Sequence, residues 1–167
     1  AVFTPSAPRV HVLVGTSTFS GLADGMPCSP NGGVFISAVG NKRPWAPTPY
    51  EEGISTDVSG MVPGSKYALS FYQANAGVEG GTDGTPLGST SRWEVSLGAE
   101  KLLSEEMPYL GEGNQTWSLQ TLIFTADAAS MPLTFMVNVP NISVLTTMYP
   151  RGQYYVMALD GVSIDCA

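Results

Sequence analysis

The fold class is decided by residues 62–71, which read VPGSKYALSF. The first four residues predict a tight turn, because proline presets one backbone dihedral and glycine accepts positive φ. The residues that follow alternate in polarity, which places Tyr67, Leu69 and Phe71 on one face and Tyr72 on the other. A turn followed by a strand with one apolar face is typical of an antiparallel β-sheet.

The same signals recur along the chain. Trp93, Val95 and Leu97 alternate with polar residues, which predicts that Trp93 belongs to the core. Further strand candidates lie at 34–39, 119–126, 133–139 and 154–164. Strands of this kind require two sheets packed face to face, and the only helix-compatible stretch is 99–107. We therefore predict one all-β domain over 1–167, an antiparallel β-sandwich.

Composition and charge exclude several functions. The chain has 167 residues and a net charge of −7, and its seven Lys and Arg residues are scattered. Nucleic-acid binding needs a basic stripe, so it is excluded, and no apolar run approaches the roughly 20 residues that span a bilayer. Charged residues are only 13% of the chain, so we expect outer faces rich in Ser, Thr, Gln and Asn, which suit neutral hydroxylated ligands.

Catalytic chemistry finds little support in the sequence. His11 is the single histidine, which excludes a three-histidine zinc site, and it is expected to point outward from a strand. The adjacent acids 51–52 and 105–106 point to opposite faces of an extended strand, so neither pair forms an acid–base couple. We expect no catalytic residue and no organic cofactor.

The two cysteines, Cys28 and Cys166, lie far apart in the sequence. They are expected to close a disulfide between an N-terminal loop and the C-terminal strand, which fits an oxidising compartment. The alternative is two unrelated free thiols.

Several motifs follow one another in a characteristic order. The most telling are VPGSKYALSF at 62–71 and ALDGVSI at 158–164, with others at 50–60, 93–98, 117–126 and 133–135. This order resembles the galactose-binding-domain-like β-jelly roll, over roughly residues 21–164. That superfamily includes many carbohydrate-binding modules and domains of cell-wall and bacterial surface proteins.

The resemblance implies a noncatalytic domain that binds a glycan or polysaccharide on the concave sheet face or in the loops at one end. It also implies a secreted or cell-surface location. The chain is either a protein by itself or one domain of a parent multidomain protein. Many relatives hold a structural calcium ion, and Asp160 matches the carboxylate that binds it. The customary N-terminal strand that often supplies another ligand has no clear match in 1–9. Asp160 is therefore either a calcium ligand or a cap for the turn before Val162.

The residues themselves point to one ligand site in a loop. Trp45 lies in the proline-rich stretch 42–50 and is followed by Tyr50. The two rings together would form a platform for the apolar face of a sugar. The alternative is a loop lid that buries both rings.

A second ligand site is predicted where one strand ends and the next begins. Tyr72, Gln73 and Asn75 end the first strand, and Arg92 and Glu94 begin the second. If the two strands pair as a hairpin, Tyr72 and Glu94 share a polar face. A plain solvated sheet face is the alternative.

We therefore expect a neutral or weakly charged glycan as the ligand. The alternative function is a structural or adhesion domain that contacts proteins without binding sugar. An exposed aromatic ring beside Arg92 or Glu94 favours sugar, whereas an apolar patch of several hundred Å² favours a protein interface.

Overall fold

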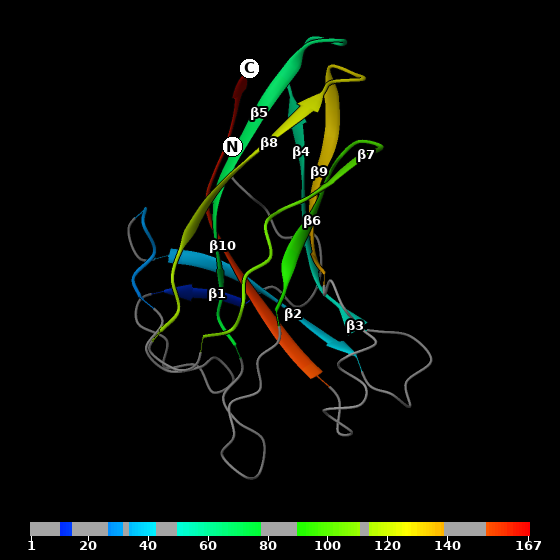
Figure 1. Ribbon diagram of the computed structural model, residues 1–167. Helices are drawn as coiled ribbons and strands as arrows, with labels where there is room; N and C mark the ends of the chain where they lie inside the picture. The colour runs from blue at the N-terminus through cyan, green and yellow to red at the C-terminus, as the bar shows by residue number, and fades with distance from the viewer. Residues whose placement is uncertain are drawn as a thin grey trace.

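A computed structural model describes residues 11–14, 27–31, 34–42, 50–77, 90–110, 114–138 and 153–167. Within these ranges the chain forms ten β-strands in two layers, as Figure 1 shows. The strands are β1 (His11–Val14), β2 (Val34–Lys42), β3 (Tyr50–Glu51), β4 (Gly53–Ser59), β5 (Lys66–Asn75), β6 (Arg92–Leu97), β7 (Glu100–Leu103), β8 (Ser118–Thr125), β9 (Ser130–Asn138) and β10 (Gln153–Cys166). The described residues include no helix that could cross a membrane.

The strands form two antiparallel sheets. The six-stranded sheet has the order β1-β2-β10-β5-β8, with β3 also paired to β2, and the four-stranded sheet has the order β4-β9-β6-β7. Consecutive strands β5 and β6 lie in different sheets, as do β7 and β8. The all-β sandwich and its jelly-roll class are therefore confirmed.

The turn and strand that begin at residue 62 are confirmed. The Ser65 N–H donates to the Val62 carbonyl at 3.0 Å, and Gly64 has a φ of +83°, which glycine adopts readily. Tyr67, Leu69 and Phe71 are buried in the core. The sequence alternation thus gave the correct inward face of β5.

Aromatic residues from both sheets meet in the core. Phe135 of β9 packs edge-to-face against Phe71 of β5 at 5.1 Å and against Trp93 of β6 at 5.9 Å between ring centroids. Edge-to-face contacts add about 0.5–1.5 kcal/mol beyond area burial. The predicted core position of Trp93 is confirmed, since its side chain is fully buried.

The chain passes between the two sheets at Glu52, which separates β3 from β4. Its N–H donates to the Val39 carbonyl at 3.0 Å, and its own carbonyl accepts the Val137 N–H at 3.3 Å. Its side-chain Oε2 also accepts the Val39 N–H at 2.9 Å. One residue therefore ties β2 of the first sheet to β9 of the second.

Two strands of the four-stranded sheet differ from the sequence prediction. The stretch 99–107 is not a helix: β7 pairs with β6 from Glu94↔Leu103 to Leu97↔Glu100. Gly98 has a φ of +60°, which makes the tight turn between these strands and replaces helical hydrogen bonds with a strand ladder. Strand β4 was also missing from the sequence prediction. It forms the edge of the four-stranded sheet and pairs with β9.

Candidate functional site

The outer face of the four-stranded sheet carries the clearest group of polar side chains. Its central row follows the strand register from Met136 through Glu94 to Leu103. Arg92 and Asn138 form the next row, at the end where β6 begins and β9 ends. We call this surface the Arg92 face, and it consists of Arg92, Glu94, Lys101, Leu103, Glu106, Met136 and Asn138.

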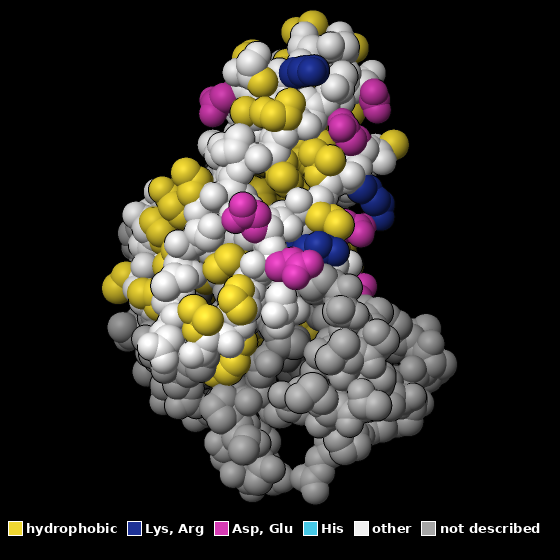
Figure 2. Space-filling view, viewed as in Figure 1, with side chains coloured by type: hydrophobic (Ala, Val, Ile, Leu, Met, Phe, Trp, Pro, Cys, Tyr) yellow, Lys and Arg dark blue, Asp and Glu magenta, His cyan; other side chains and the backbone are white. Residues whose placement is uncertain are grey.

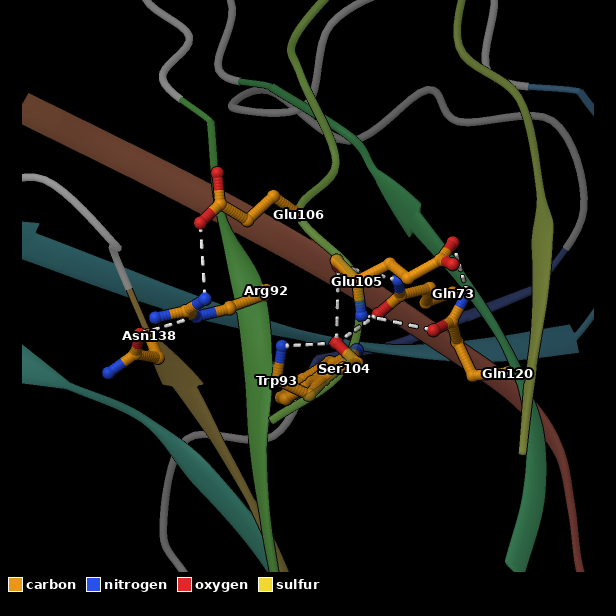
Figure 3. Close-up of polar contacts among 8 residues, drawn as sticks. All are labelled: Gln73, Arg92, Trp93, Ser104, Glu105, Glu106, Gln120 and Asn138. Atoms are coloured by element: carbon orange, nitrogen blue, oxygen red, sulfur yellow. Dashed lines mark hydrogen bonds and ion pairs between the residues drawn. The ribbon is translucent and has the colours of Figure 1, made fainter. Parts of the chain in front are cut away.

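Arg92 is held from two sides (Figure 3). Its Nε donates to Asn138 Oδ1 at 3.1 Å, and its Nη1 donates to Glu106 Oε1 at 3.1 Å. The side chain is still 21% exposed. A guanidinium carries five N–H groups, so these two bonds leave donors for an external oxygen. The arrangement presents a fixed cation and an amide side by side, which suits recognition of vicinal hydroxyl groups.

The charges of the Arg92 face balance each other. Lys101 Nζ lies 2.6 Å from Glu94 Oε1, and Arg92 pairs with Glu106. Such exposed pairs contribute only about 0–1 kcal/mol to stability. Their main consequence here is a face that carries hydrogen-bonding groups without an excess of either sign.

A buried polar network positions Glu106. The segment 104–107 crosses the end of the sandwich, where Ser104 Oγ donates to Gln73 Oε1 at 2.6 Å and accepts the Trp93 N–H at 2.9 Å. Gln73 Nε2 donates to the Glu105 carbonyl at 2.9 Å, and Gln120 Oε1 accepts the Glu105 N–H at 3.0 Å. Figure 3 shows this network beside the Arg92–Glu106 pair.

The structure places Gln73 and Asn75 inside the sandwich, so their predicted position on a solvent-facing ligand site is wrong. Gln73 is fully buried and Asn75 is 3% exposed. Asn75 Nδ2 donates to the Met107 carbonyl at 2.9 Å, and its Oδ1 accepts the Gly77 N–H at 3.2 Å. Both amides satisfy backbone groups of loop segments that lie over the end of the core.

The predicted hairpin between β5 and β6 does not form, which separates Tyr72 from Glu94. Strand β5 pairs with β10 and β8, whereas β6 pairs with β9 and β7. Tyr72 is half-buried on the outer face of the six-stranded sheet, in register with Asp160 and Leu119. Because β5 and β6 belong to different sheets, the two side chains lie on opposite outer faces.

Trp45 lies outside the described residues, and the structure describes the backbone of Tyr50 but not its side chain. The strand ends that flank the Trp45 segment are nevertheless placed. Tyr50 pairs with Asn41, and Lys42 pairs with Gln153. The Val137–Glu52 hydrogen bond places Glu52, two residues beyond Tyr50, next to Val137, the neighbour of the Asn138 that binds Arg92.

Tyr155 marks the buried side of that corner. Its ring lies so close to Gly40 that a Cβ there would fall 1.8 Å from Tyr155 Cε2. Its hydroxyl donates to Glu51 Oε1 at 3.4 Å. Burial, with a smaller contribution from the Glu51 carboxylate, raises the pKa of Tyr155 well above its usual value of about 10. The hydroxyl therefore stays protonated at physiological pH.

The adjacent carboxylates diverge, as the sequence predicts. Glu51 accepts from Tyr155, whereas Glu52 accepts from the β2 backbone. Glu105 lies near Gln120, whereas Glu106 pairs with Arg92. Neither pair converges on a common point in the way that an acid–base couple does.

Asp160 anchors a loop on the outer face of the six-stranded sheet. Its Oδ2 accepts hydrogen bonds from Ser29 Oγ and from the Asn31 N–H, the latter at 3.1 Å. Calcium takes six to eight oxygen ligands, and no group of three or more metal-binding side chains occurs among the described residues. Asp160 and Ser29 would supply only part of such a set. Calcium at Asp160 stays a prediction.

The predicted disulfide is absent, since Cys28 and Cys166 are both exposed free cysteines. Ser29, next to Cys28, contacts Asp160, whereas Cys166 lies further along β10 and pairs with Tyr67. Six residues of strand span roughly 20 Å, well beyond the about 7 Å between Cα atoms that a disulfide allows.

Five residues of the Arg92 face were not predicted as site residues: Lys101, Leu103, Glu106, Met136 and Asn138. A signal for two of them was present in the sequence. Because Leu133, Phe135 and Val137 face the core, Met136 and Asn138 must face outward. Glu106 lies outside any strand, so alternation could not have placed it.

The sequence matches no protein-family model and no curated protein. Three solved structures with a similar fold are a family 61 carbohydrate-binding module in complex with β-1,4-galactotriose, the enzymatically active domain of tailspike protein 4 of bacteriophage CBA120, and a family 16 carbohydrate-binding module. The family 61 module has a TM-score of 0.50 and 11% identity, over 99% of this chain and 88% of that chain.

The two other similarities are weaker. The tailspike domain has a TM-score of 0.49 and 12% identity over 98% of this chain, which spans 18% of the tailspike chain. The family 16 module has a TM-score of 0.42 and 11% identity over 89% of this chain and 86% of that chain. Of these three, only the family 61 module reaches 0.5. The similarity to the family 61 module supports the β-sandwich fold of this chain, and at 11% identity it does not assign a ligand.

Proposed function

We propose that this chain is a noncatalytic carbohydrate-binding domain that binds a neutral or weakly charged glycan on the Arg92 face. The observation that carries the proposal is the partly exposed guanidinium of Arg92, which Asn138 and Glu106 hold in place while N–H donors remain for a ligand. Sugar hydroxyls accept such donors well, and the balanced charges of the face favour a neutral ligand. The fold, which is similar to that of a galactotriose-binding module, supports the same class of ligand.

The aromatic part of the site is proposed to come from Trp45 and Tyr50. Tyr50 lies two residues before Glu52, whose carbonyl accepts the Val137 N–H beside Asn138. We propose that a ring from Trp45 or Tyr50 covers a sugar that contacts Arg92. Aromatic faces stack on the apolar C–H face of sugars, while planar polar groups bind the hydroxyls. Glu94 is proposed to extend the hydrogen-bonding surface toward Leu103.

We also propose a secreted or cell-surface location and a larger multidomain parent protein. A structural calcium ion at Asp160 is a separate part of the proposal and has its own test. Added calcium should raise the melting temperature, a chelator should reverse the rise, and Asp160→Asn should abolish it. An unchanged melting temperature under both conditions would remove calcium from the proposal.

The alternative, an adhesion domain that contacts protein, is favoured by a different surface. Leu119 and Ile123 on β8 are 57% and 45% exposed, on the outer face of the opposite sheet. The two functions therefore use different faces and can be tested independently.

A glycan array followed by titration calorimetry with the best oligosaccharide tests the proposal, with β-1,4-galactotriose as the first soluble probe. Arg92→Ala is expected to weaken binding at least about tenfold, since a hydrogen bond to a charged donor contributes roughly 1.5–3 kcal/mol. Lys66→Ala is the matched control, because it removes an exposed cation from the opposite sheet. An equal loss of glycan affinity in Arg92→Ala and Lys66→Ala, or no glycan binding by the folded wild type, would contradict the proposal.

A further inference from the structure

Strand β8 forms one edge of the six-stranded sheet. It pairs with β5 along its whole length, from Gln73↔Ser118 to Lys66↔Thr125, without a register shift. Among the described residues, no strand pairs with its other edge. An edge of this kind presents a row of backbone donors and acceptors to a further strand.

The direction of the backbone groups of β8 is fixed by its neighbours. The Ala126 N–H, just beyond the strand, donates to the Ser65 carbonyl, whereas the Thr125 N–H donates to Glu100 Oε2 at 2.9 Å on the other side. Hydrogen-bonding direction alternates along an antiparallel strand. Leu119, Thr121 and Ile123 therefore direct their N–H and C=O groups toward the open edge, and Glu100 caps that edge at Thr125.

The sequence of β8 lacks the features that protect natural edge strands. Such strands are usually short, charged, bulged or interrupted by proline. Ser118–Thr125 has eight residues, SLQTLIFT, with no charge, no proline and no glycine. Its outward side chains include Leu119 and Ile123, and Figure 2 shows hydrophobic side chains at the surface over β8 and β7.

The other edge strands of the described sheets are protected. Strand β1 has four residues, and β7 has four residues that include Glu100 and Lys101. Strand β4 presents Asp57 on its exposed side. Only β8, among these edges, combines length, regular register, absence of charge and exposed apolar residues.

We propose that β8 pairs antiparallel with β8 of a second copy of this chain across a two-fold axis, which joins the two six-stranded sheets into one. The strand is complementary to itself when Thr121 lies on the axis. Leu119 then lies opposite Ile123 of the second copy, so apolar residues meet apolar residues and the two hydroxyls meet each other. The same register aligns the three residues whose backbone groups face the open edge.

A second copy is favoured over an unrelated partner by this symmetry. A two-fold interface needs one surface that is complementary to itself, and β8 meets that condition without any charged group to select another partner. Cross-strand apolar and hydroxyl pairs each add roughly 0.2–1 kcal/mol. The pairing leaves the Arg92 face open, because that face belongs to the other sheet.

Sedimentation equilibrium of the full chain tests the proposal over roughly 10 µM to 1 mM protein, where weak dimers are measurable. Because each copy carries a net charge of −7, the salt concentration should be about 0.15 M, which screens charges beyond roughly 8 Å. The wild type is expected to show a monomer–dimer equilibrium. Thr121→Lys is expected to weaken dimerisation at least about tenfold, because it places two cations opposite each other on the axis.

Thr125→Lys is the matched control. It introduces the same charge on the same face of the same strand, but at a residue whose N–H is already bound to Glu100. It is expected to dimerise nearly as well as the wild type. A wild type that stays monomeric throughout, or a Thr121→Lys variant that dimerises like the control, would overturn the proposal.

Hydrogen exchange of the wild type decides the question if Thr121→Lys does not fold. The amides of Leu119, Thr121 and Ile123 are expected to exchange more slowly as the protein concentration rises. Amides of Gln120 and Leu122, which face β5, should not change, since they are already paired. Concentration-independent exchange at the three odd-numbered residues would overturn the proposal.

Discussion

Replacement of Gln73 by leucine separates a structural role from a ligand-binding role. The side chain is fully buried and joins Ser104 Oγ to the Glu105 carbonyl. Leucine has a similar volume but offers neither a donor nor an acceptor. Two groups then lose their partner, at roughly 1–3 kcal/mol each when no replacement is available. Water reaches the Glu105 carbonyl more easily than Ser104, because Glu105 is exposed and Ser104 is 4% exposed. We therefore expect a loss of about 2–4 kcal/mol in the free energy of unfolding.

Urea unfolding and calorimetry measure this loss. For a chain of this size each kcal/mol lowers the melting temperature by roughly 2–4 °C, so Gln73→Leu should lower it by roughly 4–16 °C. Ser70→Ala is the control on the same strand, because it removes only the exposed Ser70–Thr121 hydrogen bond and should cost about 0.5 kcal/mol or less. A stability of Gln73→Leu within about 0.5 kcal/mol of the wild type would refute the structural role.

Three further outcomes follow from the structure. Gly40→Ala places a Cβ 1.8 Å from Tyr155 Cε2 and should destabilise the fold by about 1–3 kcal/mol or more, as measured by thermal unfolding. When Tyr155→Leu is added to the same chain, the ring is gone and Gly40→Ala should cost much less. The raised pKa of Tyr155 keeps its hydroxyl protonated in the folded state at pH values where the unfolded chain loses that proton. Relative to Tyr155→Phe, the free energy of unfolding should therefore be unchanged below pH 10 and should fall above it by up to about 1.4 kcal/mol per pH unit. Urea unfolding at several pH values measures this difference. An equal pH dependence in both proteins would contradict the assignment. Phe135→Ala removes the ring that contacts both Phe71 and Trp93. Urea unfolding should show a loss of about 3–5 kcal/mol in the free energy of unfolding. A loss below about 1 kcal/mol would contradict the central place of this ring in the core.

Local alternation explains why much of the fold could be predicted. Period-two patterns placed Trp93, Leu69 and Phe71 correctly in the core, and the residues of the 62–65 turn adopt the predicted geometry. The same reasoning could not tell that β5 and β6 lie in different sheets, because sheet assignment depends on contacts between distant segments. Because β5 and β6 lie in different sheets, Tyr72 and Glu94 are on opposite faces of the sandwich and do not form the predicted site.

The candidate site was predicted only in part for a related physical reason. Arg92 and Glu94 were identified because they are polar residues at alternate positions on one strand. Gln73 and Asn75 look like solvent-facing residues in the sequence, yet they bind loop backbone groups that no local pattern reveals. Glu106 depends on those same loop contacts for its position beside Arg92.

Chemical-shift mapping of the backbone amides during titration with the best glycan from the array tests the proposed site most directly. The proposal predicts the largest shifts at Arg92, Glu94, Glu106 and Asn138, with the Trp45–Tyr50 segment also affected. Amides of Tyr72 and Leu119 on the opposite sheet should stay unchanged. The largest shifts at Tyr72 and Asp160, with none near Arg92, would contradict glycan binding on the Arg92 face.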